Sequence, residues 1–243
     1  MSELARTILF HIHRYDSEHG GQPQMQEYSF NTGDIEGKML LNALEHIKET
    51  QDPTLSFRRS CREGVCGSDG MNINGSNGLA CITKIIDLPS KVVLQPLPGL
   101  PVIKDLIVDM EGFFAHYKSV QPYLKNDMPP PKMERLQSPE DRAKLDGSYE
   151  CILCACCTSS CPSYWWNPDK FYGPAALLNA YRFVADTRDT ATSERLSHFK
   201  DPWKANRCRS IMNCASACPK GLNPTKAINN IKHAILKDAI TKD

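Results

Sequence analysis

Alternating apolar and polar positions near the start of the chain predict a strand from Thr7 to Tyr15. Residues 27–32 repeat the alternation after a polar, glycine-containing loop and predict the hairpin partner of this strand. From Lys38 to Glu49 the period becomes helical, and Lys91 to Gln95 predicts a further strand. The inward positions of the first strand and the helix are Ile8, Phe10, Ile12, Leu40, Ala43, Leu44 and Ile47. We expect a small mixed sheet wrapped on one helix.

The segment from Pro96 to Pro101 is the strongest stop signal in the middle of the chain, because its three prolines remove backbone donors. Helical patterning begins after it at Leu106, and Ala175–Ala185 and the residues after Asn223 also predict helices. Residues 128–132 predict an extended linker. The fold class is therefore α+β, with a sheet domain at 1–107 and an all-α domain at 108–243.

Composition and charge exclude several classes of protein. The 243 residues include 29 Lys and Arg and 28 Asp and Glu, so the formal charge of +1 argues against binding to nucleic acid. An apolar fraction of 41% is enough for a core and argues against disorder. The longest apolar region, Val92 to Met110, is broken by prolines and charges, so we expect no transmembrane helix. Glu3 and the polar residues His11, His13 and Arg14 interrupt the start of the chain, so we expect no signal peptide.

Cysteine usage is the unusual feature. Of the eleven cysteines, three lie between Cys61 and Cys81 and eight between Cys151 and Cys218. Without an export signal the thiols are expected in a reducing compartment, where tightly spaced cysteines bind metal more often than they pair with each other. An odd number also argues against complete pairing.

The first run of the second group is Cys151, Cys154, Cys157 and Cys161, followed by proline. This C-x2-C-x2-C-x3-C-P spacing is typical of bacterial ferredoxins, in which three thiolates bind one 4Fe-4S cluster and the fourth binds a neighbouring cluster. Cys156 falls outside the spacing and is interpreted as a packed bystander.

The second run, Cys208, Ile211, Cys214 and Cys218, keeps the same register but has isoleucine at the second ligand position. A cubane there would lack a ligand for one iron. We therefore expect a 3Fe-4S cluster bound by Cys161, Cys208 and Cys214. Cys218 crosses over to complete the 4Fe-4S ligand set of the first run.

Cys61, Cys66 and Cys81 fit the plant-type C-x4-C-x2-C…C pattern of a 2Fe-2S cluster, with Asp69 at the third ligand position. The Asp69 carboxylate can bind iron through oxygen, or Asp69 can be an exposed turn residue, and spacing alone leaves both open. Glycines at 64, 67, 70, 75 and 78 let the backbone approach the sulfides.

Zinc is the main competing interpretation. Zinc requires four ligands, typically as two pairs, and the cysteines of these runs do not divide into two such pairs. No G-x-G-x-x-G or complete P-loop is present, and no acid-base constellation is evident. The chain therefore carries one-electron centres without a site that could activate an organic substrate, as expected of an electron carrier between partners.

Five segments closely resemble the iron-sulfur subunits of succinate dehydrogenase, respiratory complex II. They are Ser56–Asp69, Asn77–Thr83, Cys151–Cys157, Cys161–Pro168 and Cys214–Pro224. The resemblance implies a β-grasp 2Fe-2S domain followed by a helical domain with a ferredoxin-like two-cluster core. It also implies a partner flavoprotein that oxidises succinate at FAD, membrane anchor subunits that often hold haem b, and electron transfer through the 2Fe-2S, 4Fe-4S and 3Fe-4S clusters to ubiquinone.

The resemblance further implies that Pro162, Ser163, Trp166 and Ile211 line the quinone pocket, and that the subunit is peripheral on the cytoplasmic face of the bacterial inner membrane. Arg209 departs from the family's usual histidine and could pair with a haem propionate. The related fumarate reductase subunit is an alternative, although Asp69 favours the dehydrogenase. A soluble polyferredoxin is a second alternative, against which the near-zero charge and the exposed-looking Tyr164–Trp166 segment argue.

Overall fold

The computed structural model describes residues 5–240 and divides into two compact units. One unit comprises the chain up to Met110 together with Ile152–Ser159, and the other comprises Glu111–Cys151 and the chain from Ser160 onward. The sequence analysis placed all of 108–243 in the helical domain. The segment Ile152–Ser159 instead groups with the sheet, because its backbone lies against Gly67 and Asn77.

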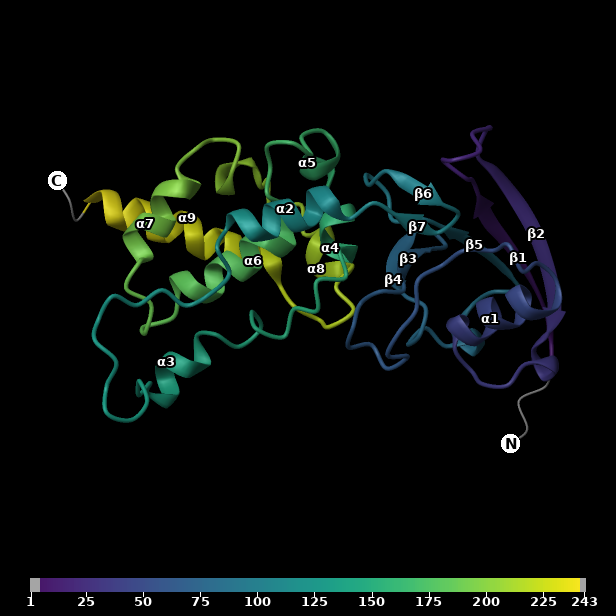
Figure 1. The fold of residues 1–243 in the computed structure, drawn as a ribbon, viewed down its shortest axis with the longest axis horizontal. Coiled ribbons are helices and arrows are strands. Elements are labelled where there is room, and N and C mark those ends of the chain that lie inside the picture. Colours follow the sequence, from purple (N-terminus) through teal and green to yellow (C-terminus); the bar gives the residue numbers. More distant parts are fainter. Residues whose placement is uncertain (1–4, 241–243) are drawn as a thin grey trace. The chain divides into compact units, whose positions relative to one another are not determined.

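A five-stranded mixed sheet forms the frame of the first unit, with the strand order β2-β1-β5-β3-β4 (Figure 1). Strands β1 and β2 are antiparallel, β1 and β5 are parallel, and β3 is antiparallel to both β4 and β5. A separate pair, β6 and β7, is antiparallel. The strands are β1 Thr7–Arg14, β2 Gln24–Asn31, β3 Gly70–Ile73, β4 Ser76–Leu79, β5 Lys91–Gln95, β6 Val102–Lys104 and β7 Ile107–Val108.

Helix α1, Leu40–Thr50, lies against the sheet and completes the core of the first unit (Figure 1). The alternation in β1 and the helical period in α1 are confirmed, because all the inward positions predicted for them are buried. The ring of His46 on α1 contacts Phe30 of β2, which stacks on Phe10 of β1. Short 3-10 helices, η1 Thr32–Asp34 and η2 Ile85–Asp87, flank these elements.

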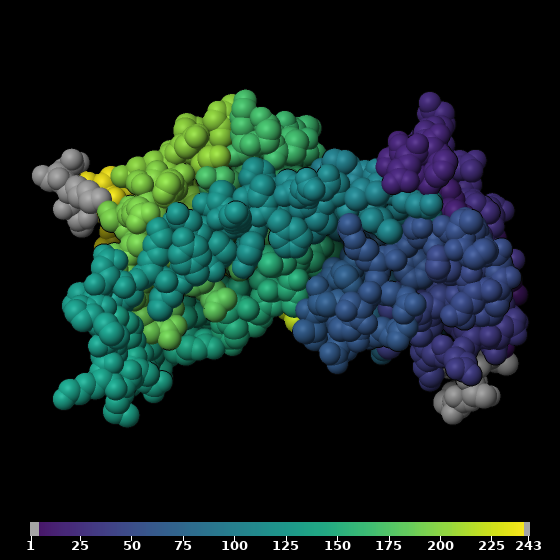
Figure 2. All heavy atoms as spheres, in the orientation of Figure 1, coloured from purple at the N-terminus to yellow at the C-terminus, as the bar shows by residue number. Residues whose placement is uncertain are grey.

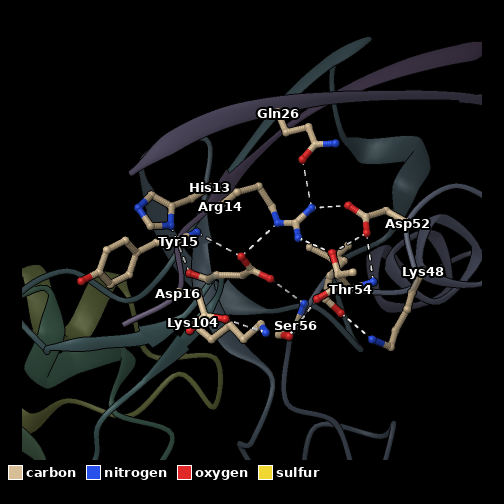
Figure 3. Close-up of polar contacts among 12 residues, drawn as sticks. His13, Arg14, Tyr15, Asp16, Gln26, Lys48, Asp52, Thr54, Ser56 and Lys104 are labelled. Carbon is tan, nitrogen blue, oxygen red and sulfur yellow. Dashed lines mark hydrogen bonds and ion pairs between the residues drawn. The ribbon is translucent and has the colours of Figure 1, made fainter. Parts of the chain in front are cut away.

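The guanidinium of Arg14, at the end of β1, organises the approach to the first cysteine loop (Figure 3). It donates to Asp105 Oδ1 at 2.9 Å and to the carboxylate of Asp52. Asp105, which is 2% exposed, also accepts the backbone N–H of Tyr15 at 3.1 Å and of Ser56 at 2.8 Å. Residues 52–56 are therefore anchored to the sheet just before the cysteine loop begins.

The prediction of helical structure from Leu106 was wrong at its start. Residues 102–108 form the β6–β7 pair, and helix α2, Glu111–Ser119, begins after it. Asp105 sits at the turn with φ of 48°, and its carboxylate is held by Arg14 and two backbone amides. These tertiary bonds favour the turn over the local helical pattern.

The second unit is helical. Its elements are α2, α3 Pro139–Ala143, α5 Pro162–Trp165, α6 Gly173–Val184, α7 Thr192–Phe199, η3 Ala205–Arg207, α8 Asn213–Ser216 and α9 Pro224–Ile240, while α4 Cys156–Ser159 belongs to the first unit (Figure 1). The predicted helices at 175–185 and after Asn223 are confirmed, and Asn223 Oδ1 caps α9 by accepting the N–H of Lys226 at 2.9 Å. Helix α9 packs on α6 and α7.

The proline-rich stretch after α2 has neither helix nor strand over residues 128–132, as predicted. Its residues are exposed, and in Figure 2 this part of the chain lies on the surface in teal. Within residues 5–240, no helix has both the length and the apolar character that a membrane crossing requires.

Candidate metal centres

The loop around Cys61 is built to stabilise a thiolate. Cys61 Sγ accepts backbone N–H groups from Glu63, Val65 and Cys66 at 3.4, 3.4 and 3.3 Å. These bonds lower the pKa of Cys61 to about 7. Because a thiolate is the form that binds metal, the loop presents one ligand in its reactive state. The sulfur of Cys66 lies beside it and accepts the Cys61 N–H at 3.5 Å.

Asp69 is buried in the same loop, with an exposed fraction of 2%. One carboxylate oxygen accepts the N–H of Cys81, and the other has no hydrogen-bond partner among the described residues. Burial, with the nearby Asp69 carboxylate, raises the pKa of Cys81 to about 12. An exposed turn residue does not fit this environment. A buried oxygen without a partner is what an iron ligand would leave when the iron is taken away.

The two cysteine runs share an unusual backbone that sequence reasoning missed. Leu153 and Ala155 have φ of 55° and 63°, and Ser210 and Met212 have φ of 55° and 74°. These residues lie two and four positions after the first cysteine of each run. Residues in this left-handed region turn backbone N–H groups toward one side and form concavities that bind anions, including iron-sulfur clusters. Since all four residues carry side chains, the conformation is strained, which is typical of functional sites.

Several predicted ligands of the 4Fe-4S centre are buried. Cys154 and Cys157 are 9% and 7% exposed, and a hydrogen bond with the side chain of Cys156 lowers the pKa of Cys154. In the second unit, Cys151 and Cys218 pack against one apolar cluster although they are far apart in sequence. The cluster consists of Leu178, Leu222 and Ala227. Cys156 itself is fully buried, in keeping with a packed bystander.

The three predicted ligands of the 3Fe-4S centre line one pocket of the second unit: Cys161, Cys208 and Cys214. Burial raises the pKa of both Cys161 and Cys214, and the charges of the neighbouring cysteines raise each further. Cys214 Sγ also lies 3.0 Å from Thr225 Oγ1. Three cysteines that line one small pocket suit the binding of a cluster whose irons favour their thiolate forms.

The same pocket is lined by Pro162, Ser163, Arg209 and Ile211, four of the five other residues that the sequence singled out. Trp166 is not part of its lining, and its side chain is 73% exposed at the end of α5. This exposure favours a contact surface over core packing for Trp166. The structure therefore brings Cys161, Cys208 and Cys214 together with Pro162, Ser163 and Ile211 in one pocket of the second unit, and it leaves Trp166 outside the lining of that pocket.

Within residues 5–240, no three His, Cys, Asp or Glu side chains converge on one point as ligands of a single metal ion do. Cluster ligands have a different geometry, because they are distributed over several irons, two on each iron of a 2Fe-2S cluster and one on each iron of a 3Fe-4S or 4Fe-4S cluster. The separate loops described above have that character.

Comparison with known proteins identifies the domains. Residues 9–115 match the family described as a 2Fe-2S iron-sulfur cluster binding domain, and residues 150–223 match the 4Fe-4S dicluster domain. These matches favour iron-sulfur clusters over zinc.

Two relatives with more than half of their aligned residues identical to this chain carry the same name. The chain is 62% identical over 231 residues to the succinate dehydrogenase iron-sulfur subunit of Coxiella burnetii, covering 95% of this chain and 98% of the relative. It is 54% identical over 227 residues to the subunit of the same name from Paracoccus denitrificans, covering 93% and 87%.

The fold also matches a solved structure, the Mycobacterium smegmatis Sdh1 complex in the apo form, with a TM-score of 0.86 at 23% identity, covering 96% of this chain and 97% of that one. This match supports the predicted α+β architecture, with a 2Fe-2S domain followed by a two-cluster helical region. The chain belongs to the family of succinate dehydrogenase iron-sulfur subunits.

Proposed function

We propose that this chain is the electron-transfer subunit of a succinate dehydrogenase, linking a flavoprotein that oxidises succinate to fumarate at FAD with the reduction of ubiquinone. When bound, the iron-sulfur clusters take up and release one electron at a time, so the chain is used twice for each succinate. The protein contributes ligands, hydrogen bonds and exclusion of water, which tune cluster potentials.

The proposed ligands fall into three sets. The 2Fe-2S set is Cys61, Cys66, Asp69 and Cys81; the 4Fe-4S set is Cys151, Cys154, Cys157 and Cys218; the 3Fe-4S set is Cys161, Cys208 and Cys214. The 2Fe-2S set is supported by the backbone N–H groups donated to Cys61 and by the buried Asp69 oxygen that has no partner among the described residues, and the 3Fe-4S set by the pocket that its three cysteines share.

The residues around the proposed 2Fe-2S centre and those around the proposed 3Fe-4S centre have different roles. At the first loop, backbone N–H groups stabilise negative charge on sulfur and Asp69 is kept from water. At the last pocket, Pro162 and Ile211 offer apolar contacts to a quinone and Ser163 offers a hydroxyl. The Trp166 N–H, from outside the lining of this pocket, is proposed as a hydrogen-bond donor to the quinone oxygen. Arg209 lines the same pocket and is proposed to pair with a haem propionate of an anchor subunit.

We further propose that membrane anchor subunits cover this part of the second unit and that the complex is peripheral on the cytoplasmic face of the inner membrane. Large apolar side chains exposed there support this assignment: Trp165 at 42%, Trp166 at 73%, Ile211 at 50% and Met212 at 43%. Exposed apolar groups of this size are typical of surfaces that meet a partner.

The observation that carries the proposal is the pocket in which Cys161, Cys208 and Cys214 lie together with Pro162, Ser163 and Ile211. It joins the ligands of a terminal electron centre to an apolar site for an acceptor.

The test is purification from the native membrane under anaerobic conditions, followed by iron and sulfide analysis, EPR spectroscopy and a succinate:quinone reductase assay. We expect copurification with a flavoprotein and membrane chains, and the EPR signals of three centres. Recovery of the chain alone with its clusters would instead indicate a polyferredoxin. Zinc in place of iron would overturn the proposal.

A further inference from the structure

The loop of the proposed 2Fe-2S centre touches the loop of the proposed 4Fe-4S centre backbone to backbone, within the first unit. A Cβ added at Gly67 would lie 2.7 Å from Cys154 Cβ, and 3.0 Å from both Cys154 Cα and the carbonyl oxygen of Ile152. At Gly70 an added Cβ would meet the Cys154 carbonyl oxygen at 3.0 Å. The 2.7 Å approach at Gly67 is closer than a Cβ atom can come, and the 3.0 Å approach at Gly70 is tight, so glycine at position 67 permits the contact.

A buried amide fastens the same two segments on the other side of the contact. Asn77 of β4 is 9% exposed, and its Nδ2 donates to the Cys156 carbonyl at 3.1 Å and to Ser159 Oγ at 2.8 Å. Its Oδ1 accepts from Asn72 of β3 at 2.8 Å. Since buried hydrogen bonds of this kind are costly to break, α4 is fixed to the β3–β4 hairpin.

The positions of these two joints relative to the proposed ligands are informative. Gly67 stands between Cys66 and Asp69, and the residues it meets include Cys154 itself. The carbonyl that Asn77 holds belongs to Cys156, next to Cys157. A shift at either joint moves ligands of one centre relative to ligands of the other. The rate of electron transfer between two centres falls exponentially with their separation, and so does not tolerate such a shift.

We propose that Gly67 and Asn77 are positioning residues that set the spacing between the 2Fe-2S and 4Fe-4S ligand loops. This inference rests on the proposed function, because it assumes that both loops hold their clusters. It assigns to two residues outside the ligand sets a role in the transfer of electrons from one loop to the next.

The chain offers a matched control for each residue. Gly20, between β1 and β2, has φ of +70°, close to the +69° of Gly67, but nothing lies within 4 Å of an added Cβ. Gly20→Ala therefore carries the backbone strain of Gly67→Ala without the steric conflict. Asn179 of α6 is a buried amide in the second unit, 5% exposed, that donates to the Ala175 carbonyl at 2.9 Å. Asn179→Ala removes a buried amide hydrogen bond within α6 that does not join the two loops.

The experiment compares Gly67→Ala, Asn77→Ala and the two controls in the assembled, purified complex. Iron and sulfide content establishes that both clusters are present. EPR power saturation then measures how strongly the reduced 2Fe-2S signal is relaxed by the neighbouring paramagnetic 4Fe-4S centre, an interaction that weakens steeply with distance. We expect a severalfold loss of this relaxation enhancement in Gly67→Ala and Asn77→Ala, accompanied by slower electron transfer between the centres, and wild-type behaviour in both controls.

Unchanged relaxation in either Gly67→Ala or Asn77→Ala, with both clusters retained, would overturn the proposal. If Gly67→Ala does not assemble, Asn77→Ala decides the matter by the same measurement. Loss of clusters from both variants counts against a positioning role and favours a purely structural one. A wild-type complex without the two EPR signals would refute the proposed function instead, so the two failures are distinguishable.

Discussion

The Asp69 carboxylate accepts the backbone N–H of Cys81 at 2.6 Å through Oδ2, while its Oδ1 is buried without a partner among the described residues. The cysteine spacing places Asp69 at the third ligand position of the first loop. The buried carboxylate is oriented as a ligand at that position would be. The hydrogen bond fixes the carboxylate next to one proposed ligand, and the second oxygen remains available to iron. Oxygen and sulfur ligands give a 2Fe-2S cluster different spectra and potentials.

Asp69→Cys is therefore expected to retain the 2Fe-2S cluster with shifted EPR g values and visible circular dichroism, because thiolate replaces carboxylate on one iron. Asp87→Cys is the control, because Asp87 is exposed and this substitution adds a thiol outside the cysteine loop. Spectra of Asp69→Cys identical to wild type would show that Asp69 does not bind iron.

Arg195 and Asp189 form an ion pair in the second unit at 2.8 Å, with 2% and 0% of their side chains exposed. The guanidinium also donates to the carbonyls of Gln121 and Tyr123 at 2.8 and 2.6 Å, which ties the segment after α2 to α7. Breaking such a pair from one side leaves a buried charge without its partner.

Arg195→Met is expected to destabilise the protein by about 3–5 kcal/mol and to lower its melting temperature by roughly 6–20 °C. The exposed pair of Arg142 and Asp146 is the comparison, for which Arg142→Met should leave the melting temperature nearly unchanged. Thermal unfolding followed by circular dichroism measures both. Equal melting temperatures for the two variants would contradict the assigned role of the buried pair.

The periodicity of apolar residues was sufficient to predict β1, α1 and β5, because each presents a regular apolar face to one core. It failed for β3, β4 and the β6–β7 pair. These strands have only two to four residues, too few to display an alternation, and β3 and β4 contain glycine and asparagine, which are poor strand formers. Their pairing depends on contacts distant in the sequence, such as the bonds of Arg14 to Asp105 and of Asn72 to Asn77.

The proposed ligands could be predicted from the sequence, because a cluster requires cysteines at a regular spacing. The contacts that hold the ligand loops in place could not be predicted. The left-handed residues Leu153, Ala155, Ser210 and Met212 carry side chains and so give no glycine signal. The close approach of Gly67 to Cys154 joins positions far apart in the chain, and only the folded structure brings them together.

Asp52 gives a pH-dependent prediction. Burial raises the pKa of Asp52, but hydrogen bonds from Thr54 and Arg14 (Figure 3) and from Tyr28 together outweigh burial and hold the pKa well below its usual value. A carboxyl whose pKa is depressed in the folded state contributes stability above its unfolded pKa of about 3.9 and loses it as pH falls.

The difference in melting temperature between wild type and Asp52→Asn should consequently be constant above about pH 5 and shrink as the pH falls below about 4. Asp146→Asn, at a 59% exposed carboxylate, is the control and should show little difference at any pH. Comparison of variants that carry the same clusters cancels the acid sensitivity of the clusters themselves. A difference for Asp52→Asn that is equal at both ends of the range would contradict the prediction.

Ile211 occupies the register position that a fourth cysteine would take in the second run, and it lines the pocket with Cys208 and Cys214. Ile211→Cys should convert the three-iron centre into a four-iron cubane of lower potential and slow quinone reduction. The EPR signal of the oxidised three-iron centre would then disappear. Ile211→Val is the control, because it keeps an apolar side chain without a lone pair. Persistence of the three-iron signal in Ile211→Cys would exclude this ligand arrangement.

Trp166 tests the acceptor end of the chain. Its indole is 73% exposed at the C-terminal end of α5, so both the N–H and the ring are accessible to a partner. Trp166→Leu should lower the rate of quinone reduction about tenfold, equivalent to the loss of about 1.4 kcal/mol, with cluster content and EPR signals preserved. Trp203→Leu is the matched control, because Trp203 is also exposed, at 40%, but its ring lies against the side chains of Lys170 and Arg207. A normal rate of quinone reduction in Trp166→Leu would show that the Trp166 N–H does not bind the quinone, because loss of a hydrogen-bond donor to the quinone must slow its reduction.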